Sequence, residues 1–468
     1  MKGNNGQAAR KRTLHRMMFG GGLCLFGIGA LLTGLFSSSS ADGTSHRQLL
    51  RSDNVDKVKN AAHKLQDKAR KFRQDLHKQH HEDFDEAEMI EKILEAEIHL
   101  VSLGLNEEEL ERSHPSSYAG IYGHFCKLNF AAHKKDPAAV PMFRDLVSHS
   151  PDCDMQDVFK VDLKKIADLA RHRDKIAAEN DEPVPRVLNL TTVAFHESRC
   201  GSTLVANALL AMDPAKHRTY SESQPGSQAL KSTCGDNYNR CTVDQAAAIL
   251  KDTVYMMSRS NDPQEERVFF KFQSITTKNI EVFQKAFPEV PWMFVYRDPV
   301  QVMMSHIKDD PTLKYAKCVA TQSHHPPKDI KQIAFSHGRD AKTMAKEEYC
   351  AAHLAAISEA AVNRLNDHAI PMNYDGLIVR LYEEVLPRIW GRALTQDEIA
   401  NVQKVSQTYS KGRGKRHVDF KGDSEAKEHA ASDEVKEAAA LILKPSYDAL
   451  EQFHPKLLER DLPGVGIN

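Results

Sequence analysis

The sequence predicts an α/β fold of three layers, in which helices cover both faces of a central parallel sheet. Two observations lead to this prediction. Beyond residue 185, short runs rich in β-branched and aromatic residues alternate with helical segments, and two of these runs end in clusters of basic and hydroxyl residues. Such alternation is typical of parallel βαβ units. We therefore assign residues 184–468 to one α/β domain.

The individual elements follow from the composition of each segment. Strands are expected at 187–195, 267–272, 292–296 and 369–374, where apolar and β-branched residues gather. Helices are expected at 202–212, 279–287, 382–394, 396–409 and 433–444. In a sheet of this kind, ligands bind at the carboxyl ends of the strands. The residues that follow each strand are therefore the place to look for a site.

The N-terminal residues predict a membrane anchor. Residues 1–16 are basic and contain no acid, and residues 17–36 form an uncharged run of 20 residues, which is long enough to cross a bilayer. Positive charge before the span keeps that side cytosolic, so we expect a single-pass type II protein with its remainder in the lumen. A cleaved signal peptide is the alternative, although the apolar run exceeds an ordinary signal.

Residues 37–113 are interpreted as a helical stem. Apolar residues recur there in steps of three and four, at Val55, Val58, Ala62, Leu65, Ala69, Phe72 and Leu76. This spacing predicts a coiled coil, and with it a homodimer through the stem. A lone amphipathic helix packed on the globular part is the alternative. Residues 114–183 are expected to form a small helical region that ends at the linker sequence NDEPVP.

Composition narrows the partners and the compartment. The chain has 468 residues and a formal net charge of −1, so it presents no global positive field for nucleic acid. Seven of its eight cysteines lie beyond the expected span. The simplest pairing joins neighbours, as Cys126 with Cys153, Cys234 with Cys241 and Cys318 with Cys350, and leaves Cys200 free, although about fifteen connectivities are formally open. Such bridges suit the secretory pathway.

The sequence FHESRCGSTLVANALL predicts an anion-binding turn between a strand and a helix. Gly201 lets backbone N–H groups approach an anion, Ser202 and Thr203 supply hydroxyl donors, and the helix N-terminus adds partial positive charge. Arg199 can grip two oxygens of a phosphate or sulfate at once. The turn is P-loop-like in position, but it lacks the lysine of nucleoside-triphosphate P-loops, which argues against an ordinary kinase.

A second strand end supports the first. In PWMFVYRDPVQVMMSH, a buried strand is followed by Arg297 and then by a helix that bears Ser305. Eight residues span about two helical turns, so the two side chains can meet around one phosphate. Two such strand ends in one sheet predict a ligand with phosphate groups at both ends.

These motifs resemble the sulfotransferases that use 3′-phosphoadenosine 5′-phosphosulfate (PAPS). The resemblance implies that the loop of Arg199, Cys200, Gly201, Ser202 and Thr203 holds the 5′-phosphosulfate, and that Arg297 and Ser305 hold the 3′-phosphate. It covers about residues 185–390 and includes MNYDGL at 372–377. Arg199 stands where cytosolic members usually carry lysine and membrane-anchored members often carry arginine. This difference implies a Golgi membrane protein.

The resemblance also implies a base for the acceptor hydroxyl. Glu222 stands where related enzymes place such an acid, although a surface acid in a serine-rich loop is the alternative. His196 and Glu197 are rivals because they flank the anion loop. Lys271 either points toward the site or reaches solvent. Lys411 and Arg413, in YSKGRGKR, either close over the 3′-phosphate or form a solvated loop.

The function expected from these residues is metal-independent transfer of a sulfuryl group from PAPS to a hydroxyl of a glycan or a protein tyrosine. A nucleotide-dependent phosphotransferase and a non-catalytic Golgi binding protein with the same fold are the alternatives. Acceptor contacts are expected from the loops 225–244 and 309–331. No charge pattern in these loops names the acceptor.

Overall fold

The computed structural model describes residues 86–235, 239–307, 316–413 and 422–459. The predicted cytosolic tail, membrane anchor and most of the stem lie outside the described residues, so those predictions stay predictions. Among the helices within the four described ranges, none combines the length and the apolar character that a membrane span needs.

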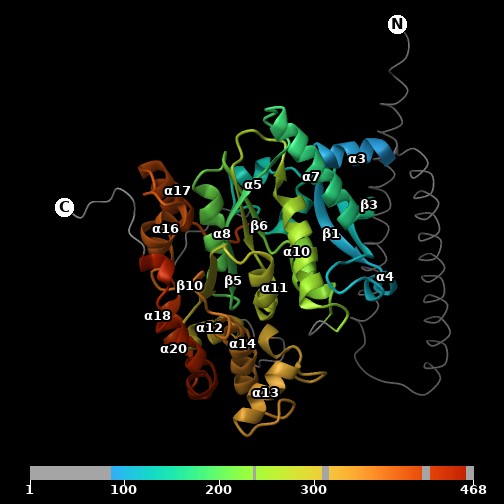
Figure 1. The fold of residues 1–468 in the computed structure, drawn as a ribbon. Helices are drawn as coiled ribbons and strands as arrows, with labels where there is room; N and C mark the ends of the chain where they lie inside the picture. Colours follow the sequence, from blue (N-terminus) through green and yellow to red (C-terminus); the bar gives the residue numbers. More distant parts are fainter. Residues whose placement is uncertain (1–85, 236–238, 308–315, 414–421, 460–468) are drawn as a thin grey trace, which may run out of the picture. The chain divides into compact units, whose positions relative to one another are not determined.

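A five-stranded parallel sheet forms the centre of the described part (Figure 1). The strands are ordered β10-β9-β5-β8-β6, and all neighbours are parallel. Their bounds are β5 Asn189–His196, β6 His217–Ser221, β8 Arg267–Lys271, β9 Trp292–Tyr296 and β10 Ala369–Asn373. The expected central parallel sheet is therefore confirmed, with one strand more than the sequence suggested.

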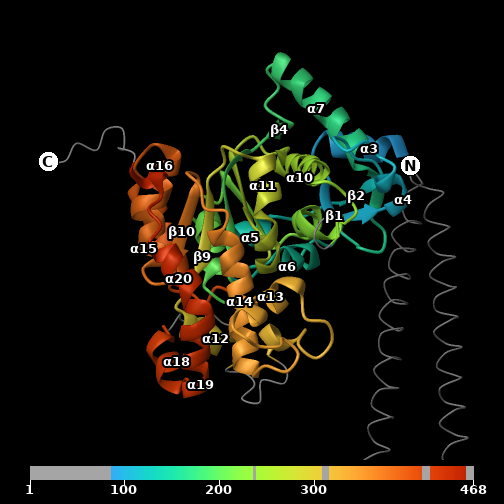
Figure 2. The same ribbon diagram turned by 60° about the horizontal axis from the view of Figure 1, so that its bottom comes forward.

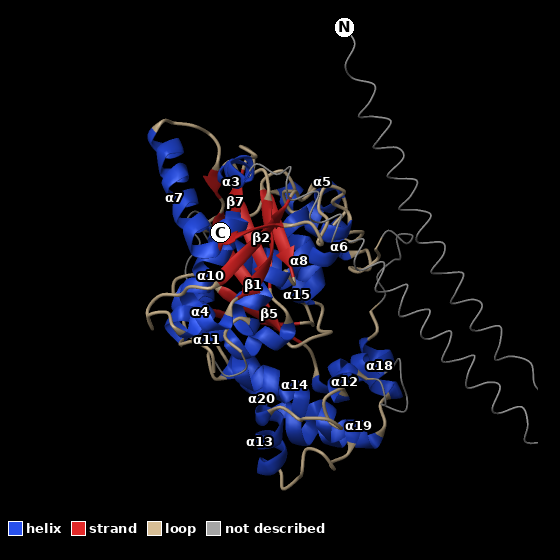
Figure 3. Cartoon of the chain, turned by 90° about the vertical axis from the view of Figure 1, so that its right-hand side faces the viewer, coloured by secondary structure: helices blue, strands red, loops and turns tan. Residues whose placement is uncertain are grey.

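Side-chain alternation places a separate core on each face of this sheet. Phe195 and Phe294 pack with helices α10 (Val243–Ser258) and α11 (Ile280–Ala286). Ala194 and Val295 point to the other face, because successive residues of a strand alternate. That second face packs against helices α8 (Ser202–Ala211), α15 (Leu377–Arg380), α16 (Leu386–Trp390) and α17 (Gln396–Ser406). The three-layer arrangement is confirmed, and Figure 3 shows the strands between helices.

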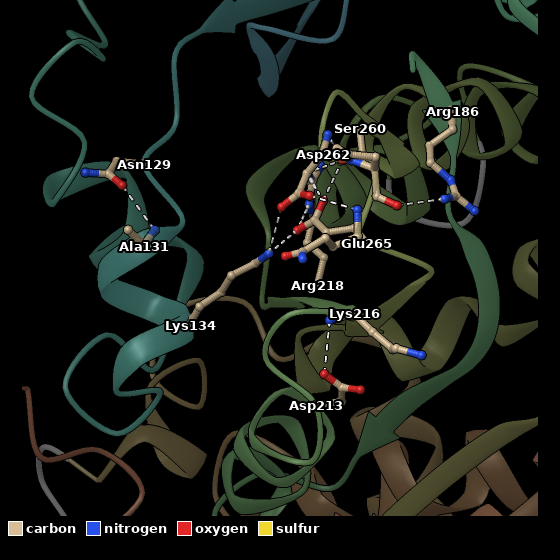
Figure 4. Close-up of polar contacts among 12 residues, drawn as sticks. Asn129, Ala131, Lys134, Arg186, Asp213, Lys216, Arg218, Ser260, Asp262 and Glu265 are labelled. Atoms are coloured by element: carbon tan, nitrogen blue, oxygen red, sulfur yellow. Dashed lines mark hydrogen bonds and ion pairs between the residues drawn. The ribbon is translucent and has the colours of Figure 1, made fainter. Parts of the chain in front are cut away.

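The additional strand is the edge strand β6, with the sequence HRTYS, for which the sequence predicts no strand. All five of its residues are buried. Arg218 can be buried because Glu265, Ser260 and the backbone carbonyl of Arg259 accept its hydrogen bonds, and Lys134 also pairs with Glu265 (Figure 4). Buried charge is tolerated when it is paired in this way. Local composition gives no sign of such distant partners.

The predictions for the stem up to residue 113 and for a helical region at 114–183 are wrong in their described parts. Strands β1 (His99–Leu105), β2 (Ile121–Cys126) and β3 (Phe159–Asp162) form an antiparallel sheet in the order β1-β2-β3. Their apolar residues belong to the same core as one face of the central sheet, so burial overrides the helical preference of the region. The same stretch of chain forms the helices α3 (Glu86–Leu94), α4 (Glu107–Glu111), α5 (Ala131–Lys135), α6 (Phe143–Ser148) and α7 (Leu163–Glu179), of which α7 packs on β2 and β3.

The amide of Gln228 fastens the small antiparallel sheet to the central domain. Its oxygen accepts from Leu103 N–H at 2.7 Å, and its nitrogen donates to the Leu103 carbonyl at 2.9 Å. Gln228 begins the short π-helix Gln228–Ser232, which directly follows α9 (Gln224–Ser227). The N-terminal sheet is therefore an integral wall of the α/β unit rather than a separate preface.

A second cluster of helices builds its own core beyond the sheet. It contains α12 (Pro299–Ile307), α13 (Lys328–Ser336), α14 (Lys346–Val362) and α19 (Asp433–Ala438). Helix α18 (Ser424–Ala430) packs on α12, and Figure 2 shows these two helices next to α19. The remaining elements are β4 (Arg186–Val187), β7 (Arg259–Ser260), α20 (Lys444–Glu451), the 3₁₀ helices Ser274–Asn279, Lys317–Val319 and Lys456–Glu459, and the π-helices Leu381–Val385 and Ala439–Leu443.

The disulfide pairing agrees with the simplest expectation. The structure joins Cys126 to Cys153, Cys234 to Cys241 and Cys318 to Cys350. Within the described ranges, Cys200 is the free and buried cysteine. The first bridge ties the end of β2 to the loop that follows α6, which is the segment that borders the site described below.

Candidate active site

The two predicted anion loops leave the sheet side by side. β5 and β9 are parallel neighbours, with His196 opposite Val295. Neighbouring strands lie about 5 Å apart, so the chain segments that carry Arg199 and Arg297 start from adjacent points on one edge of the sheet. This is the carboxyl edge, where ligands bind in open α/β sheets.

Unusual backbone conformations gather at this edge. Ser198 and Arg199 have φ values of 92° and 54°, and Gly201 has a φ of 86°. Glu222, directly after β6, has a φ of 55°. Non-glycine residues with positive φ are strained, and such strain concentrates at functional sites. Three of these residues, Arg199, Gly201 and Glu222, are ones that the sequence analysis predicted for the site.

Tyr374 connects the two anion loops. A Cβ atom at Gly201 would lie 2.6 Å from the Tyr374 ring, so the close approach requires glycine there. The guanidinium of Arg297 lies over the same ring, 4.0 Å from its centroid. The Tyr374 N–H also donates to the Tyr296 carbonyl at 2.8 Å. The MNYDGL motif thus holds both loops against one aromatic ring.

The hydroxyl residues of the first loop lie in the first turn of α8. Ser202 and Thr203 are both buried, and Gly201 is the residue that precedes the helix. The thiol of Cys200 points into the sheet and donates to the Val295 carbonyl at 3.0 Å. Burial raises the pKa of this thiol to about 11. Cys200 therefore offers its backbone to a ligand while its side chain stays protonated and inward.

Arg297 is buried and already holds anionic and polar partners. Its Nε atom donates to Gln301 Oε1 at 2.8 Å, and a terminal nitrogen donates to Asp423 Oδ1 and to Ser424 Oγ, each at 2.9 Å. Asp423 precedes α18, so this contact bridges two distant segments. A carboxylate thus lies at the guanidinium, which shows that this position suits an anion.

Ser305 lies on α12, whereas Arg297 precedes this helix. The Ser305 hydroxyl donates to the Gln301 carbonyl at 2.9 Å, one helical turn before it. The side chain of the same Gln301 accepts from Arg297 Nε, so Gln301 contacts both predicted ligands. Within the described residues, the structure gives no direct contact between Arg297 and Ser305.

Glu197 is a buried carboxyl group between the loops. It accepts from the Arg297 N–H at 3.1 Å and from the Ser358 hydroxyl at 3.4 Å. Burial raises its pKa to about 8. Because its hydrogen bonds are directed to backbone and to α14, Glu197 positions the second loop and does not face the cleft.

Glu222 and Lys271 form an ion pair at the ends of neighbouring strands β6 and β8. Lys271 Nζ donates to Glu222 Oε1, and the Lys271 side chain is 1% exposed whereas that of Glu222 is 26% exposed. Burial opposes ionisation of Glu222, but the Lys271 charge and hydrogen bond outweigh it and lower the pKa. The described residues give the second carboxylate oxygen no hydrogen bond, so it is free to accept one. The Ser-rich surface loop that we considered for Glu222 is not what the structure shows.

His196 lies beside this pair in a form that suits a base poorly. Its Nδ1 atom accepts from the Ser198 N–H at 3.1 Å, so the proton of the neutral ring is assigned to Nε2. Burial, with the charges of Lys271 and Lys411, keeps its pKa well below the ordinary value. Nε2 lies 3.7 Å from Glu222 Oε1, which is longer than a hydrogen bond. This arrangement favours Glu222 over His196 as a proton acceptor.

The basic loop after α17 reaches the site through one of its two candidate residues. Burial lowers the pKa of Lys411 to about 8, with further contributions from the charges of Lys271 and Arg199. Asn207 of α8 donates to the Ser410 carbonyl at 3.0 Å and holds the loop there. Arg413 instead pairs with Asp145 of α6 at 3.3 Å. Lys411 thus joins the predicted site, whereas Arg413 fastens the loop to α6.

A cleft of 810 Å³ opens next to Glu222. Its walls come from the N-terminal segment, including Met142, Phe143 and Arg144, and its polar floor includes Gln273. None of the described residues of the loops 225–244 and 309–331 lines this cleft. The wall comes instead from the segment that follows β2, and the acceptor contacts expected from the two loops stay a prediction.

Three contacts were beyond the sequence interpretation: the Asp423 contact of Arg297, the buried Glu197 and the cleft wall at Arg144. The first two depend on side chains that lie far apart in the sequence. The third had a readable signal, since Ile121 and Phe125 alternate with the more polar Tyr122 and His124, a period typical of a strand. Recognising β2 would have drawn the following segment toward the central sheet.

Comparisons with known proteins give a distant result. No family model and no curated protein match the chain. Among solved structures, the sulfotransferase STF9 from Mycobacterium avium matches with 14% identity and a TM-score of 0.32, covering 64% of this chain and 86% of its own. The sulfotransferase domain of the Synechococcus PCC 7002 olefin synthase matches with 12% identity and a TM-score of 0.32. This match covers 59% of the present chain and 97% of the Synechococcus domain. These scores are too low to support an argument about function, which rests on the site itself.

Proposed function

We propose that the protein transfers a sulfuryl group from PAPS to a hydroxyl acceptor. One observation supports this above the others: adjacent strand ends bring two arginines to one edge of the sheet, beside an ionised carboxylate that faces a cleft. A cosubstrate with phosphate groups at both ends suits the first feature. An alcohol or phenol that must lose a proton suits the second.

The residues present fit the cosubstrate. The backbone of residues 199–201, the hydroxyls of Ser202 and Thr203, and the charge of Arg199 would hold the 5′-phosphosulfate. Arg297 would hold the 3′-phosphate, which would take the place of the Asp423 carboxylate at the guanidinium. Ser305 of α12 would contribute its hydroxyl to the same group, as the resemblance implies. PAPS supplies the activated sulfuryl group when bound.

The chain's own residues then handle the acceptor. Glu222 accepts the proton of the acceptor hydroxyl at its free oxygen, and the buried Lys271 keeps the carboxylate ionised. Lys411 and Lys271 supply positive charge beside the sulfuryl group, where negative charge develops on the oxygens. Placing the acceptor hydroxyl in line supplies much of the remaining rate. This chemistry needs no metal ion.

We also propose that the enzyme works in the lumen of the Golgi, anchored by residues 17–36 and able to dimerise through its stem. Three disulfides support an oxidising compartment. The anchor and the stem themselves rest on the sequence. Protease protection of the tagged full-length chain in microsomes tests this topology, because a cytosolic C-terminus would be digested and would refute it.

Binding of adenosine 3′,5′-bisphosphate to the purified full-length protein tests the function. We expect calorimetry in EDTA to show micromolar binding to the wild-type protein and at least a hundredfold weaker binding to Arg199→Ala and to Arg297→Ala. Exposed Arg112, which directly follows α4, gives the control variant Arg112→Ala, which should bind like the wild type. Preference for ATP with Mg²⁺ would indicate a phosphotransferase instead. Failure to bind either nucleotide would leave the non-catalytic binding protein.

A further inference from the structure

The cleft beside Glu222 has a distinct chemical character. Half of the residues that line it are apolar, among them Met142, Phe143 and Met155, of which Met155 is 40% exposed. Arg144 is the single basic side chain among the residues that line it. The described residues provide Arg144 with no ion-pair partner, and the side chain is exposed. An unpaired cation at the rim of a partly apolar cleft is suited to bind an anionic group.

Fixed contacts hold this wall against the reacting end of the site. The Ser221 hydroxyl contacts Met142 Sδ at 3.7 Å, directly before Glu222 in the chain. The disulfide Cys126–Cys153 fastens the loop that follows α6, and the Arg413–Asp145 ion pair fastens α6 itself. The positive charge of Arg144 also acts on the Glu222 carboxylate. Arg144 and the free oxygen of Glu222 can therefore contact one small molecule.

We propose that this cleft is the acceptor site, and that it takes a hydroxyl on a compact ring which presents an apolar face and a single anionic group, as a uronic acid sugar does. This proposal rests on the proposed function and names its acceptor class. The ring's C–H face would pack on Met142 and Phe143, and its carboxylate would pair with Arg144. The hydroxyl would then meet Glu222.

The charges in the cleft favour this acceptor over an acidic tyrosine peptide. Several acidic residues would require several cations along the cleft, but Arg144 stands alone among the lining residues. Asp154 and Glu222, which also line the cleft, would repel further carboxylates. An acceptor with one anionic group close to its hydroxyl matches the single cation of this cleft, whereas an acceptor with several acidic residues does not.

A matched pair of small probes tests the proposal by binding alone. para-Nitrophenyl glucuronide and para-nitrophenyl glucoside share ring and aglycone and differ in one carboxylate. We expect saturation-transfer NMR on the full-length protein to give a dissociation constant about fivefold lower for the glucuronide. Arg144→Ala should bring the ratio of the two constants to about one. Arg144→Lys should restore part of it, and Arg112→Ala should keep it.

Each outcome has a definite meaning. Equal affinity of the two probes, binding of neither, or an unchanged ratio in Arg144→Ala would overturn the proposal. So would a tyrosine peptide flanked by acidic residues that displaces the glucuronide and depends on Arg144 more strongly than the glucuronide does. If the wild-type protein does not bind adenosine 3′,5′-bisphosphate, the proposed function is refuted instead. The two results can be told apart, because binding of the sugar probes is measured without the cosubstrate.

Discussion

Two buried ion pairs at opposite ends of the sheet show how the same chemistry serves stability in one place and a site in the other. Arg218 of β6 and Glu265 are 3% and 1% exposed, and further donors from Ser260 and Lys134 satisfy the Glu265 carboxylate. Lys271 of β8 is equally buried, but its partner Glu222 is 26% exposed and keeps one oxygen free. A fully satisfied carboxylate cannot take part in chemistry, whereas a half-satisfied one can.

The largest expected effect comes from removing the carboxylate charge of the Lys271–Glu222 pair. Glu222→Gln should lower kcat about a thousandfold, because the variant loses a general base. Its affinity for adenosine 3′,5′-bisphosphate should stay within about twofold, because Glu222 does not contact the phosphate groups. Radiolabelled PAPS measures turnover and calorimetry measures affinity. A kcat within tenfold of the wild type would move the base role to His196.

Breaking the Arg218–Glu265 pair should instead lower the stability of the fold. Glu265→Gln leaves the Arg218 guanidinium buried without its counterion, so the free energy of unfolding should fall by about 3 kcal/mol. Glu222→Gln should lower it by about 1 kcal/mol, because water in the cleft can reach the altered side chain. Urea denaturation of both variants measures the difference. Equal losses would mean that the two pairs play the same structural role.

The third test removes the positive charge of Lys271 from the Lys271–Glu222 pair. In Lys271→Met, burial would act on Glu222 with only the smaller contributions of Lys411 and Arg144 to oppose it, so the pKa of Glu222 should rise. Because turnover requires the carboxylate form, the ascending limb of the pH–rate profile should move to higher pH. The midpoint of that limb, read from the residual rate, gives the result. An unchanged midpoint would show that Lys271 does not control the ionisation of Glu222.

The smallest expected effect concerns Lys411, which faces Lys271, Arg199, Arg413, Glu222 and His196. With a pKa of about 8, this lysine loses its charge as the pH rises through that value. Affinity for adenosine 3′,5′-bisphosphate should therefore weaken about fivefold between pH 7 and pH 9. Lys411→Arg stays charged and should remove this dependence. Parallel pH profiles in the two proteins would place Lys411 away from the ligand.

The sequence predicts what local patterns encode. The strands at β5, β8, β9 and β10 were recognisable because each is a short apolar run, and Gly201 and Pro299 marked the turns that follow two of them. Neighbouring cysteines suggested the three bridges, which the structure contains. Arg199 and Arg297 were marked by their place after a predicted strand, Lys411 by its basic loop, and Glu222 by the family resemblance.

What the sequence left out depends on distant partners. β6 is polar, and it is buried because Glu265, 47 residues away, pairs with Arg218. The Asp423 that contacts Arg297 lies 126 residues away. The small antiparallel sheet was missed because its strands lie between helical segments in the sequence, and the core that buries them comes from later residues. Pairings of this kind become visible when the chain is folded.

The shared core has a practical consequence for anyone who shortens this chain. A fragment that starts at residue 184 looks like a natural choice from the sequence, since it contains every strand of the parallel sheet. It would lack β1 to β3, expose the face of Phe270 and Tyr220 that packs in the same core, and leave Gln228 without Leu103. Recombinant fragments should therefore begin before residue 86, so that both halves of the hydrophobic interior are synthesised together.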